Sequence, residues 1–298
     1  SIAEIPVAIA NKNNLSLYDG MKKLGKDVGP IKRNVLGCAQ TGSCGHGCPI
    51  DAKQSMLVTL LPDAIKAGAA IVSRARVERV VYEKARAVAV EGVFLDAWGR
   101  EATGVRFTVK PRLVVVSAGA INTPALLLKS DTPDRSGLLG HRTFLHPVIA
   151  SLALFHEPVR GWQGAPQSIA SEAFARRGDD VGFFLEVAPM HPMLASTALP
   201  GFSRDHLALM RQLPYAAGHL ALTIDGFHDD VVGGRVSVSA SGRPVLDYPI
   251  VERQWRAMKD AQKELARVGL AAGAHTVGTG HDPPLMVKSE ADIAKIDD

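Results

Sequence analysis

The segment from Leu113 to Lys129 constrains the fold of this chain most strongly. Its first part is an unbroken apolar run, residues 113–116, which is typical of a strand buried on both faces. A turn of small residues follows, and the sequence then predicts a helix with Thr123 as its N-cap and Pro124 at its first position. Strand, small-residue turn and helix form a geometry that binds nucleotide phosphates and riboses. Because ordinary α/β connections share this pattern, it does not identify a nucleotide site by itself.

Shorter elements are predicted before this segment. Residues 16–25 have the apolar spacing of a short amphipathic helix that ends at glycine. Residues 55–68 predict a second helix, and a start at Pro62 remains open because proline suits the first helical turn. Residues rich in β-branched and apolar side chains indicate four strands, at 69–72, 75–82, 88–95 and 105–110.

The character of the sequence changes after Pro147. Long loops there separate four predicted strands, at 148–155, 183–188, 218–225 and 235–239. The clearest helical spacing of the whole chain follows at residues 253–272, with Gly273 beyond its end. We therefore expect a domain boundary near Pro147.

Length and composition exclude several classes of protein. The 298 residues can bury a sizeable core without disulfides or metal, and the net charge of +4 is small and scattered. No basic stripe indicates nucleic-acid binding, and the sequence predicts no transmembrane segment and no signal peptide. Three cysteines within eleven positions do not suit a secreted disulfide framework. We expect a reducing, cytoplasmic location, with a periplasmic or membrane-peripheral one left open.

The three cysteines, Cys38, Cys44 and Cys48, lie on one glycine-rich loop and are the first candidates for chemistry. Three thiolates suit a three-iron cluster, and the proline after Cys48 is also found in ferredoxin sequences. A zinc site completed by His46 is a second interpretation. The third is that three small thiols pack a tight loop without any metal.

Other catalytic patterns are weak. The ten histidines are scattered without metalloprotease spacing, and the chain has no G-x-S-x-G nucleophile motif. Glu186 follows the apolar residues 182–185 and is a candidate to line a substrate cavity. A position on the solvated face of its strand is the alternative interpretation for this carboxylate.

Several blocks in order resemble the glucose–methanol–choline (GMC) family of FAD-dependent alcohol oxidoreductases. Residues 44–55, CGHGCPIDAKQS, resemble the family element C-x-x-G-C-x-x-G-A-K-x-S, with Asp51 where glycine is usual. Residues 114–128, VVVSAGAINTPALLL, resemble the family block V-V-x-A-A-G-A-x-x-T-P-x-L-L-L. Within the family, the cysteine loop and residues 161–168 look most like long-chain alcohol oxidases and dehydrogenases. The cysteine spacing also resembles the cluster loop of bacterial FAD glucose dehydrogenases, which strengthens the iron–sulfur interpretation.

The resemblance implies a fold class of α/β plus α+β. One part is a piece of an FAD-binding Rossmann-like domain, and the other is a substrate domain built on a mostly antiparallel sheet flanked by helices. We expect a linking segment with the cysteine loop at 1–54, part of the FAD-binding domain at 55–146 and the substrate-binding domain at 147–298.

The resemblance also implies roles for individual residues. Val77 corresponds to the strand residue whose backbone pairs with the adenine of FAD. Ser117, Ala118 and Gly119 correspond to the turn beside the adenosine ribose and pyrophosphate, where small side chains let the cofactor approach.

Two family features are missing from the sequence. No G-x-G-x-x-G turn for the FAD pyrophosphate is present, and His275 and His281 lie too early to match the family's catalytic histidine pair. We therefore expect the chain to be the central portion of a family member, with its catalytic residues beyond the C-terminus of this chain.

These features together predict FAD-dependent oxidation of a small-molecule alcohol, bulky and apolar, to an aldehyde or ketone. The expected electron acceptor is oxygen, or a quinone or cytochrome if the iron–sulfur cluster exists. Two alternatives remain open at this point. One is a non-catalytic fragment or subunit of a flavoprotein, and the other is a subunit of an iron–sulfur-containing FAD sugar or alcohol dehydrogenase.

Overall fold

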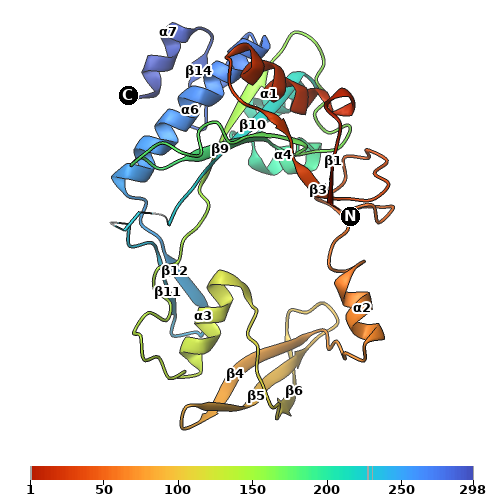
Figure 1. Ribbon diagram of the computed structural model, residues 1–298, viewed down its shortest axis with the longest axis vertical. Coiled ribbons are helices and arrows are strands. Elements are labelled where there is room, and N and C mark those ends of the chain that lie inside the picture. The colour runs from red at the N-terminus through yellow and green to blue at the C-terminus, as the bar shows by residue number, and fades with distance from the viewer. Residues whose placement is uncertain (1, 227, 230, 298) are drawn as a thin grey trace. The chain divides into compact units, whose positions relative to one another are not determined.

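A computed structural model describes residues 2–226, 228–229 and 231–297 of the chain. Packing divides the chain into two compact units (Figure 1). The first unit comprises three segments, Ser1–Asp63, His146–Asp225 and Val251–Asp298. The second unit comprises Ala64–Leu145 and Gly226–Ile250. Each unit is therefore assembled from segments that are distant in the sequence.

A seven-stranded antiparallel sheet forms the centre of the first unit, in the order β14-β13-β7-β10-β9-β8-β2. Its strands are β2 (Gly29–Pro30), β7 (Val148–Leu154), β8 (Ile169–Ser171), β9 (Phe183–Val187), β10 (Ala216–Thr223), β13 (Thr276–Gly278) and β14 (Met286–Val287). A separate two-stranded sheet pairs β1 (Ile2–Glu4) with β3 (Lys32–Asn34).

The helices of the first unit are α1 (Lys12–Lys23), α4 (Pro192–Ala198), α5 (Arg204–Gln212), α6 (Glu252–Ala272) and α7 (Glu290–Ile293). Short 3-10 helices lie at Val7–Ile9, Leu213–Tyr215 and Ala294–Ile296. Helix α2 (Leu60–Lys66) spans the division between the units.

Helices α1 and α6 cover one face of the large sheet (Figure 1). The strands alternate, so that Phe183, Leu185 and Val187 of β9 point to this face and are fully buried. Leu17 of α1 and Leu265 of α6 pack into the same apolar core. Burial of this face is the main apolar contribution to the stability of the first unit.

The two helices approach each other closely at Gly20. A Cβ atom at this position of α1 would lie 2.3 Å from the carbonyl oxygen of Val268 on α6. Only glycine permits this approach without a shift of one helix.

Three asparagines at the start of α1 bind the loops that surround the sheet. The Asn11 side chain caps the helix by accepting a hydrogen bond from the backbone N–H of Asn14, at 2.9 Å. The Asn13 amide donates to the carbonyl of Ala188 and accepts the N–H of Gly218. The Asn14 oxygen accepts the N–H groups of both Ser168 and Ile169. Because Asn13 and Asn14 are buried, these bonds fix the backbone of strands and loops far away in the sequence.

The opposite face of the sheet carries a mostly apolar surface that we call the open face. Part of this face, at Leu154 and Ala216, is buried in an apolar cluster that includes Ala195 of α4. The open face consists of seven other residues that alternate with the core residues along β7, β8, β9 and β10: Val148, Ala150, Ala170, Phe184, Glu186, Leu220 and Leu222. Val148 and Ala150 are exposed and the other five are half-buried. Strand register brings Glu186 between Ala170 and Leu220.

The second unit contains a three-stranded antiparallel sheet, a helix and a hairpin. The sheet consists of β4 (Ala75–Glu83), β5 (Arg86–Leu95) and β6 (Ala102–Val109). Helix α3 (Gly119–Lys129) packs on β4 and on the hairpin of β11 (Arg235–Val238) and β12 (Pro244–Asp247). The expected domain ranges placed residues 226–250 with the third segment, whereas in the structure this hairpin packs on α3.

Most elements predicted from the sequence are confirmed. Strands β4, β5, β6, β7, β9, β10 and β11 occupy the predicted segments. Helix α6 covers residues 252–272, and Gly273 ends it in the left-handed conformation with φ of 102°. Helix α2 begins just before Pro62, which therefore lies in its first turn. Helix α1 starts at Lys12, earlier than the spacing at 16–25 indicated, because Asn11 provides the cap.

Two predicted strands and one predicted cap are wrong. Residues 69–72 and 113–116 pair with no strand in the described part of the chain, and Leu113 and Val115 are 78% and 76% exposed. An apolar run forms a strand only where another strand satisfies its backbone hydrogen bonds. Helix α3 begins at Gly119, four residues before Thr123, so Thr123 lies inside the helix and is not its N-cap. Its hydroxyl accepts the N–H of Ala118, which is the N-cap residue.

Mixed helices and antiparallel sheets confirm the predicted fold class. Over the described residues, no helix has both the length and the apolar character needed to cross a membrane.

A buried histidine gives the first unit a pH-dependent stability. The Nε2 atom of His219 lies 2.7 Å from the Ser16 hydroxyl, which donates its own hydrogen to the Asn13 carbonyl. The imidazole therefore donates from Nε2, and Nδ1 has no hydrogen-bond partner among the described residues. Desolvation lowers the pKa of His219 from 6.5 to about 4.

We expect the free energy of unfolding to fall as the pH decreases from 6.5 to about 4, because the unfolded state binds the proton first. At the lower pH, His219 reduces the free energy of unfolding by about 3 kcal/mol relative to neutral pH. Urea unfolding of the wild type and of His219→Gln between pH 7.5 and 4.5 gives the free energy of unfolding of each protein at each pH. The contribution of His219 is the difference between the two slopes of this free energy against pH. Identical slopes would contradict the buried neutral imidazole.

Candidate functional site

The turn before α3 is the candidate nucleotide site of the second unit. Ser117, Ala118 and Gly119 are all exposed. Gly119 has a φ of 86°, a conformation that side chains disfavour, and a Cβ atom built there would meet no atom within 4 Å. The turn therefore leaves open space beside its backbone, as a bound cofactor requires.

The first turn of α3 has unsatisfied donors. Its N-cap residue, Ala118, provides no side-chain cap, and the first turn contains no acidic residue. The first N–H groups of a helix have no partner within the helix and carry the positive end of its dipole. An anionic group of a nucleotide fits this helix start.

Hydrogen bonds at the other end of α3 attach it to β4. The Ser130 hydroxyl accepts the N–H of Val80 at 2.9 Å and donates to the Leu126 carbonyl at 2.7 Å. The Tyr82 hydroxyl lies 3.1 Å from that of Thr132. The strand that carries Val77 and the helix that follows the small-residue turn are thus held in one packed unit.

Val77 lies on an edge strand at a break in strand pairing. β4 is the edge of its sheet, and its register with β5 shifts between Val77 and Arg79. Edge strands present backbone N–H and C=O groups without strand partners, and bulges are common beside functional sites. This backbone is therefore available to a ligand that pairs with it, such as a nucleotide base.

Glu186 lies on the open face of the first unit, on β9. It is half-buried, and its Oε2 atom accepts a hydrogen bond of 3.4 Å from the Gln167 amide. The apolar neighbours Phe184 and Leu222 are paired across β9 and β10 on the same face. The sequence selected Glu186 and the apolar segment 183–188 that contains Phe184, and the period of two along each strand places Leu222 on the same face.

The cysteine loop contacts residues 161–168 within the first unit. The Gln40 carbonyl accepts the N–H of Gly164 at 3.1 Å. A Cβ atom at Gly42 would lie 2.0 Å from the Trp162 carbonyl oxygen, so glycine is needed for this close contact. Arg33 connects the two segments through hydrogen bonds to the Cys44 sulfur, at 3.6 Å, and to the Ser168 hydroxyl, at 3.4 Å.

The three cysteines are free and do not form a group of metal ligands. The Cys38 sulfur accepts the N–H of Gln40, and the Cys44 sulfur accepts from Arg33. Within residues 2–226, 228–229 and 231–297, no group of three or more His, Cys, Asp or Glu side chains is placed to hold a metal ion. The structure therefore does not provide the ligand set of the predicted iron–sulfur cluster on Cys38, Cys44 and Cys48, nor that of the alternative zinc site. The thiols bond to neighbours within their own segment, a possibility that cysteine spacing alone does not exclude.

Cys48 has an environment that stabilises its thiolate. Hydrogen bonds from backbone N–H groups, that of Lys53 first and then those of Ile50 and Ala52, lower the pKa of the Cys48 thiol. Desolvation opposes this lowering of the pKa, and the Asp51 carboxylate opposes it to a smaller extent. A thiol with these properties at a partly exposed position is more reactive than an ordinary cysteine.

The histidines form contacts that spacing did not predict. His46 of the cysteine loop packs against His191 with ring centroids 4.2 Å apart, and His156 stacks on His275 at 4.5 Å. His146 contacts the edge of Phe184 on the open face, with centroids 5.4 Å apart.

Comparison with known proteins places these features in a family. The sequence profile of the family described as GMC oxidoreductase matches residues 5–148. A GMC-type oxidoreductase of Mycobacterium tuberculosis is 33% identical over 279 residues, which cover 94% of this chain and 42% of that protein. A long-chain-alcohol oxidase of Arabidopsis thaliana is 26% identical over 291 residues, which cover 93% of this chain and 37% of that protein.

The fold agrees with this comparison. The crystal structure of pyridoxine 4-oxidase from Mesorbium loti superimposes with a TM-score of 0.55 at 16% identity, over 98% of this chain and 58% of that one. The profile, the relatives and the fold agree on one class of proteins, the GMC oxidoreductases. The chain belongs to the GMC oxidoreductase family. It spans 42% of the length of the mycobacterial relative.

The thiolate environment of Cys48 leads to a prediction about alkylation. We expect iodoacetamide at pH 7 to modify Cys48 several times faster than the thiol of N-acetylcysteine, because the backbone donors increase its thiolate fraction. Peptide mass spectrometry over time measures the rate at each cysteine. Cys48→Ser should remove the fast phase and Cys38→Ser should retain it, and a fast phase that survives in Cys48→Ser would disprove the assignment.

Proposed function

We propose that this chain contributes to the FAD-dependent oxidation of an alcohol to an aldehyde or ketone. The observation that carries the proposal is the open small-residue turn before α3, whose helix start lacks a side-chain cap. This turn coincides with the block that resembles the FAD-binding element of the family. The membership of the chain in an oxidoreductase family supports the same function.

The residues of the second unit fit FAD as the cofactor. Ser117, Ala118 and Gly119 would lie beside the ribose and pyrophosphate, since their small and exposed side chains allow close approach. The N–H groups of the first turn of α3 would stabilise the negative charge of the pyrophosphate. The backbone of Val77 would pair with the adenine from the edge strand β4. When bound, FAD supplies the acceptor for the two electrons that the alcohol loses.

The open face of the first unit supports a bulky apolar alcohol as substrate. Phe184, Leu220 and Leu222 form an apolar surface with one carboxylate, Glu186, among them. Such a surface excludes water from a hydrocarbon chain, while a single polar group can orient a hydroxyl. Long-chain alcohol oxidation by the Arabidopsis relative agrees with this substrate class.

The electron acceptor that we propose is oxygen, with a quinone or cytochrome as the alternative. The three free thiols agree with the reducing, cytoplasmic location expected from the sequence.

Flavin absorbance tests this function directly. The purified protein should show the two absorption bands of an oxidised flavin, and a long-chain primary alcohol should bleach them under anaerobic conditions. Ala118→Glu places a carboxylate at the start of α3, where it would repel the pyrophosphate, so we expect at least about a tenfold loss of bound flavin, equivalent to about 1.4 kcal/mol.

Ala85→Glu is the matched control. It makes the same replacement in the exposed turn between β4 and β5, beside Lys84 and Arg86, and should retain flavin. A colourless wild-type protein, or equal flavin content in both variants, would contradict the proposed cofactor site. A yellow protein that no alcohol bleaches would instead indicate a non-catalytic flavoprotein.

A second variant tests the substrate surface. Leu222→Glu introduces a charge on the open face, and we expect kcat/KM for a long-chain alcohol to fall at least about tenfold with flavin content unchanged. The effect should be smaller for a short-chain alcohol. Leu207→Glu, at an exposed position of α5, is the control. Equal losses for both chain lengths would show that the open face does not bind the alkyl chain.

A further inference from the structure

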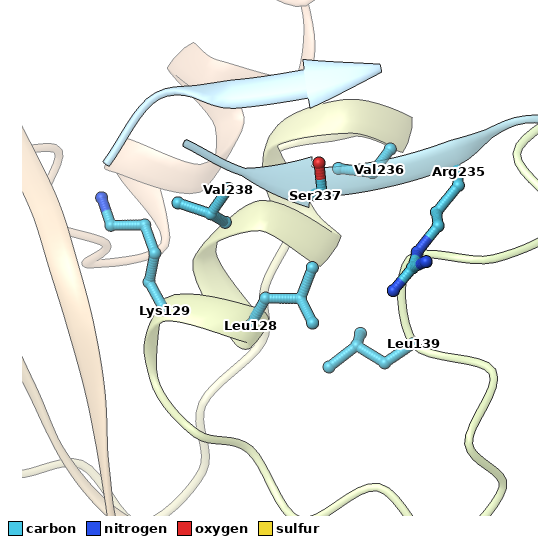
Figure 2. A pocket seen from close by; sticks show the side chains of 7 residues that line it. All are labelled: Leu128, Lys129, Leu139, Arg235, Val236, Ser237 and Val238. Carbon is cyan, nitrogen blue, oxygen red and sulfur yellow. The ribbon is translucent and has the colours of Figure 1, made fainter. Parts of the chain in front are cut away.

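A groove lies between the last turn of α3 and strand β11 in the second unit (Figure 2). Its volume is about 300 Å³, at the lower end of the range for small-molecule sites. The residues of the proposed FAD turn, 117–119, do not line it. The groove is thus a separate feature of this unit.

Backbone contacts make the groove a preformed one. The N–H of Val236 donates to the Gly140 carbonyl at 2.7 Å, which holds the segment containing Leu139 against β11. A Cβ atom at Gly140 would lie 2.4 Å from the Val236 carbonyl oxygen, so glycine is required for this close contact. Leu128, on the last turn of α3, completes the wall. These contacts position the lining side chains before any ligand binds.

The floor of the groove is apolar. Leu128, Leu139 and Val238 are half-buried and Val236 is buried. Ser237 provides the single uncharged polar side chain in the lining. This surface favours a hydrocarbon over a sugar or a free phosphate, because it offers few hydrogen bonds to replace those with water.

Two cations lie at opposite ends of the floor. Figure 2 shows the Arg235 guanidinium extending from β11 toward Leu139, and Lys129 at the other end beside Val238. Neither cation has an ion pair with any residue that the structure describes. An arginine guanidinium binds a carboxylate through two parallel hydrogen bonds, whereas the lysine adds a positive charge without that geometry.

We propose that this groove binds a medium-chain carboxylate, with the carboxylate on Arg235 and the straight alkyl chain over the apolar floor. Size agrees with this class of ligand. At roughly 30 Å³ for a group of the size of a water molecule, the groove holds about ten non-hydrogen atoms, as many as octanoate contains. Lys129 adds to the positive potential that attracts the anion.

Isothermal titration calorimetry of the purified protein with octanoate tests the proposal. We expect one site per chain with a Kd of about 1 mM or tighter. Two probes separate the contributions: 1-octanol has the chain without the charge, and acetate has the charge without the chain. Each should bind at least about tenfold more weakly than octanoate.

Arg235→Gln locates the site. It removes the charge and keeps a polar side chain at an exposed position, and it should weaken octanoate binding about tenfold. Arg243→Gln is the matched control, because Arg243 belongs to the same hairpin but does not line the groove. It should bind octanoate like the wild type.

Four results would overturn the proposal. They are no octanoate binding at about 10 mM, equal affinity for 1-octanol, unchanged affinity in Arg235→Gln, and equal weakening in Arg243→Gln. Because calorimetry needs no flavin, the outcome does not depend on the proposed oxidation.

Discussion

Buried amide hydrogen bonds from α1 hold the first unit together. The Asn14 side chain accepts hydrogen bonds from backbone N–H groups at the start of β8, and the Asn13 side chain bonds to the backbone of β10 and of the residue after β9. Without these side chains, the backbone groups would have no hydrogen-bond partner. Asn11 extends the same cluster to Gln163, in the segment that the cysteine loop touches. An apolar side chain of similar size would fill the space and leave these backbone groups unsatisfied, at a cost of about 1–3 kcal/mol each. The shape of the loops around the sheet thus depends on one turn of one helix.

This arrangement decides which face of the sheet is free for chemistry. With α1 and α6 on one side, the opposite side carries Phe184, Leu220 and Leu222, and Glu186 is the carboxylate among them. Close packing at Gly20 brings the two helices together, so that a single core covers β7, β10 and β9. The surface that we assign to the alcohol is therefore a consequence of how the core is built.

The second unit depends on a different constraint, the attachment of α3 at its C-terminal end. Ser130 fastens the helix to β4, while Gly140 and Val236 bring the following loop against β11. The helix start remains exposed, with its N–H groups available to an anion. One helix therefore serves two surfaces: the small-residue turn at its beginning and the apolar groove at its end.

The sequence by itself determined the family, the long helix and the small-residue turn, because these depend on local spacing and on motifs with a fixed order. It also predicted strands β4, β5 and β6 of the second unit and β7, β9 and β10 of the large sheet, but not the short strands β2, β8, β13 and β14 that complete that sheet. Tertiary structure decided what spacing cannot express. The apolar run 113–116 is not a strand here, since pairing requires a second strand that the described residues do not provide. Cys38, Cys44 and Cys48 are close in sequence, yet their sulfur atoms bond to separate neighbours, because loop geometry and not spacing directs a side chain. The groove at Arg235 joins residues more than a hundred positions apart, and only packing could bring them together.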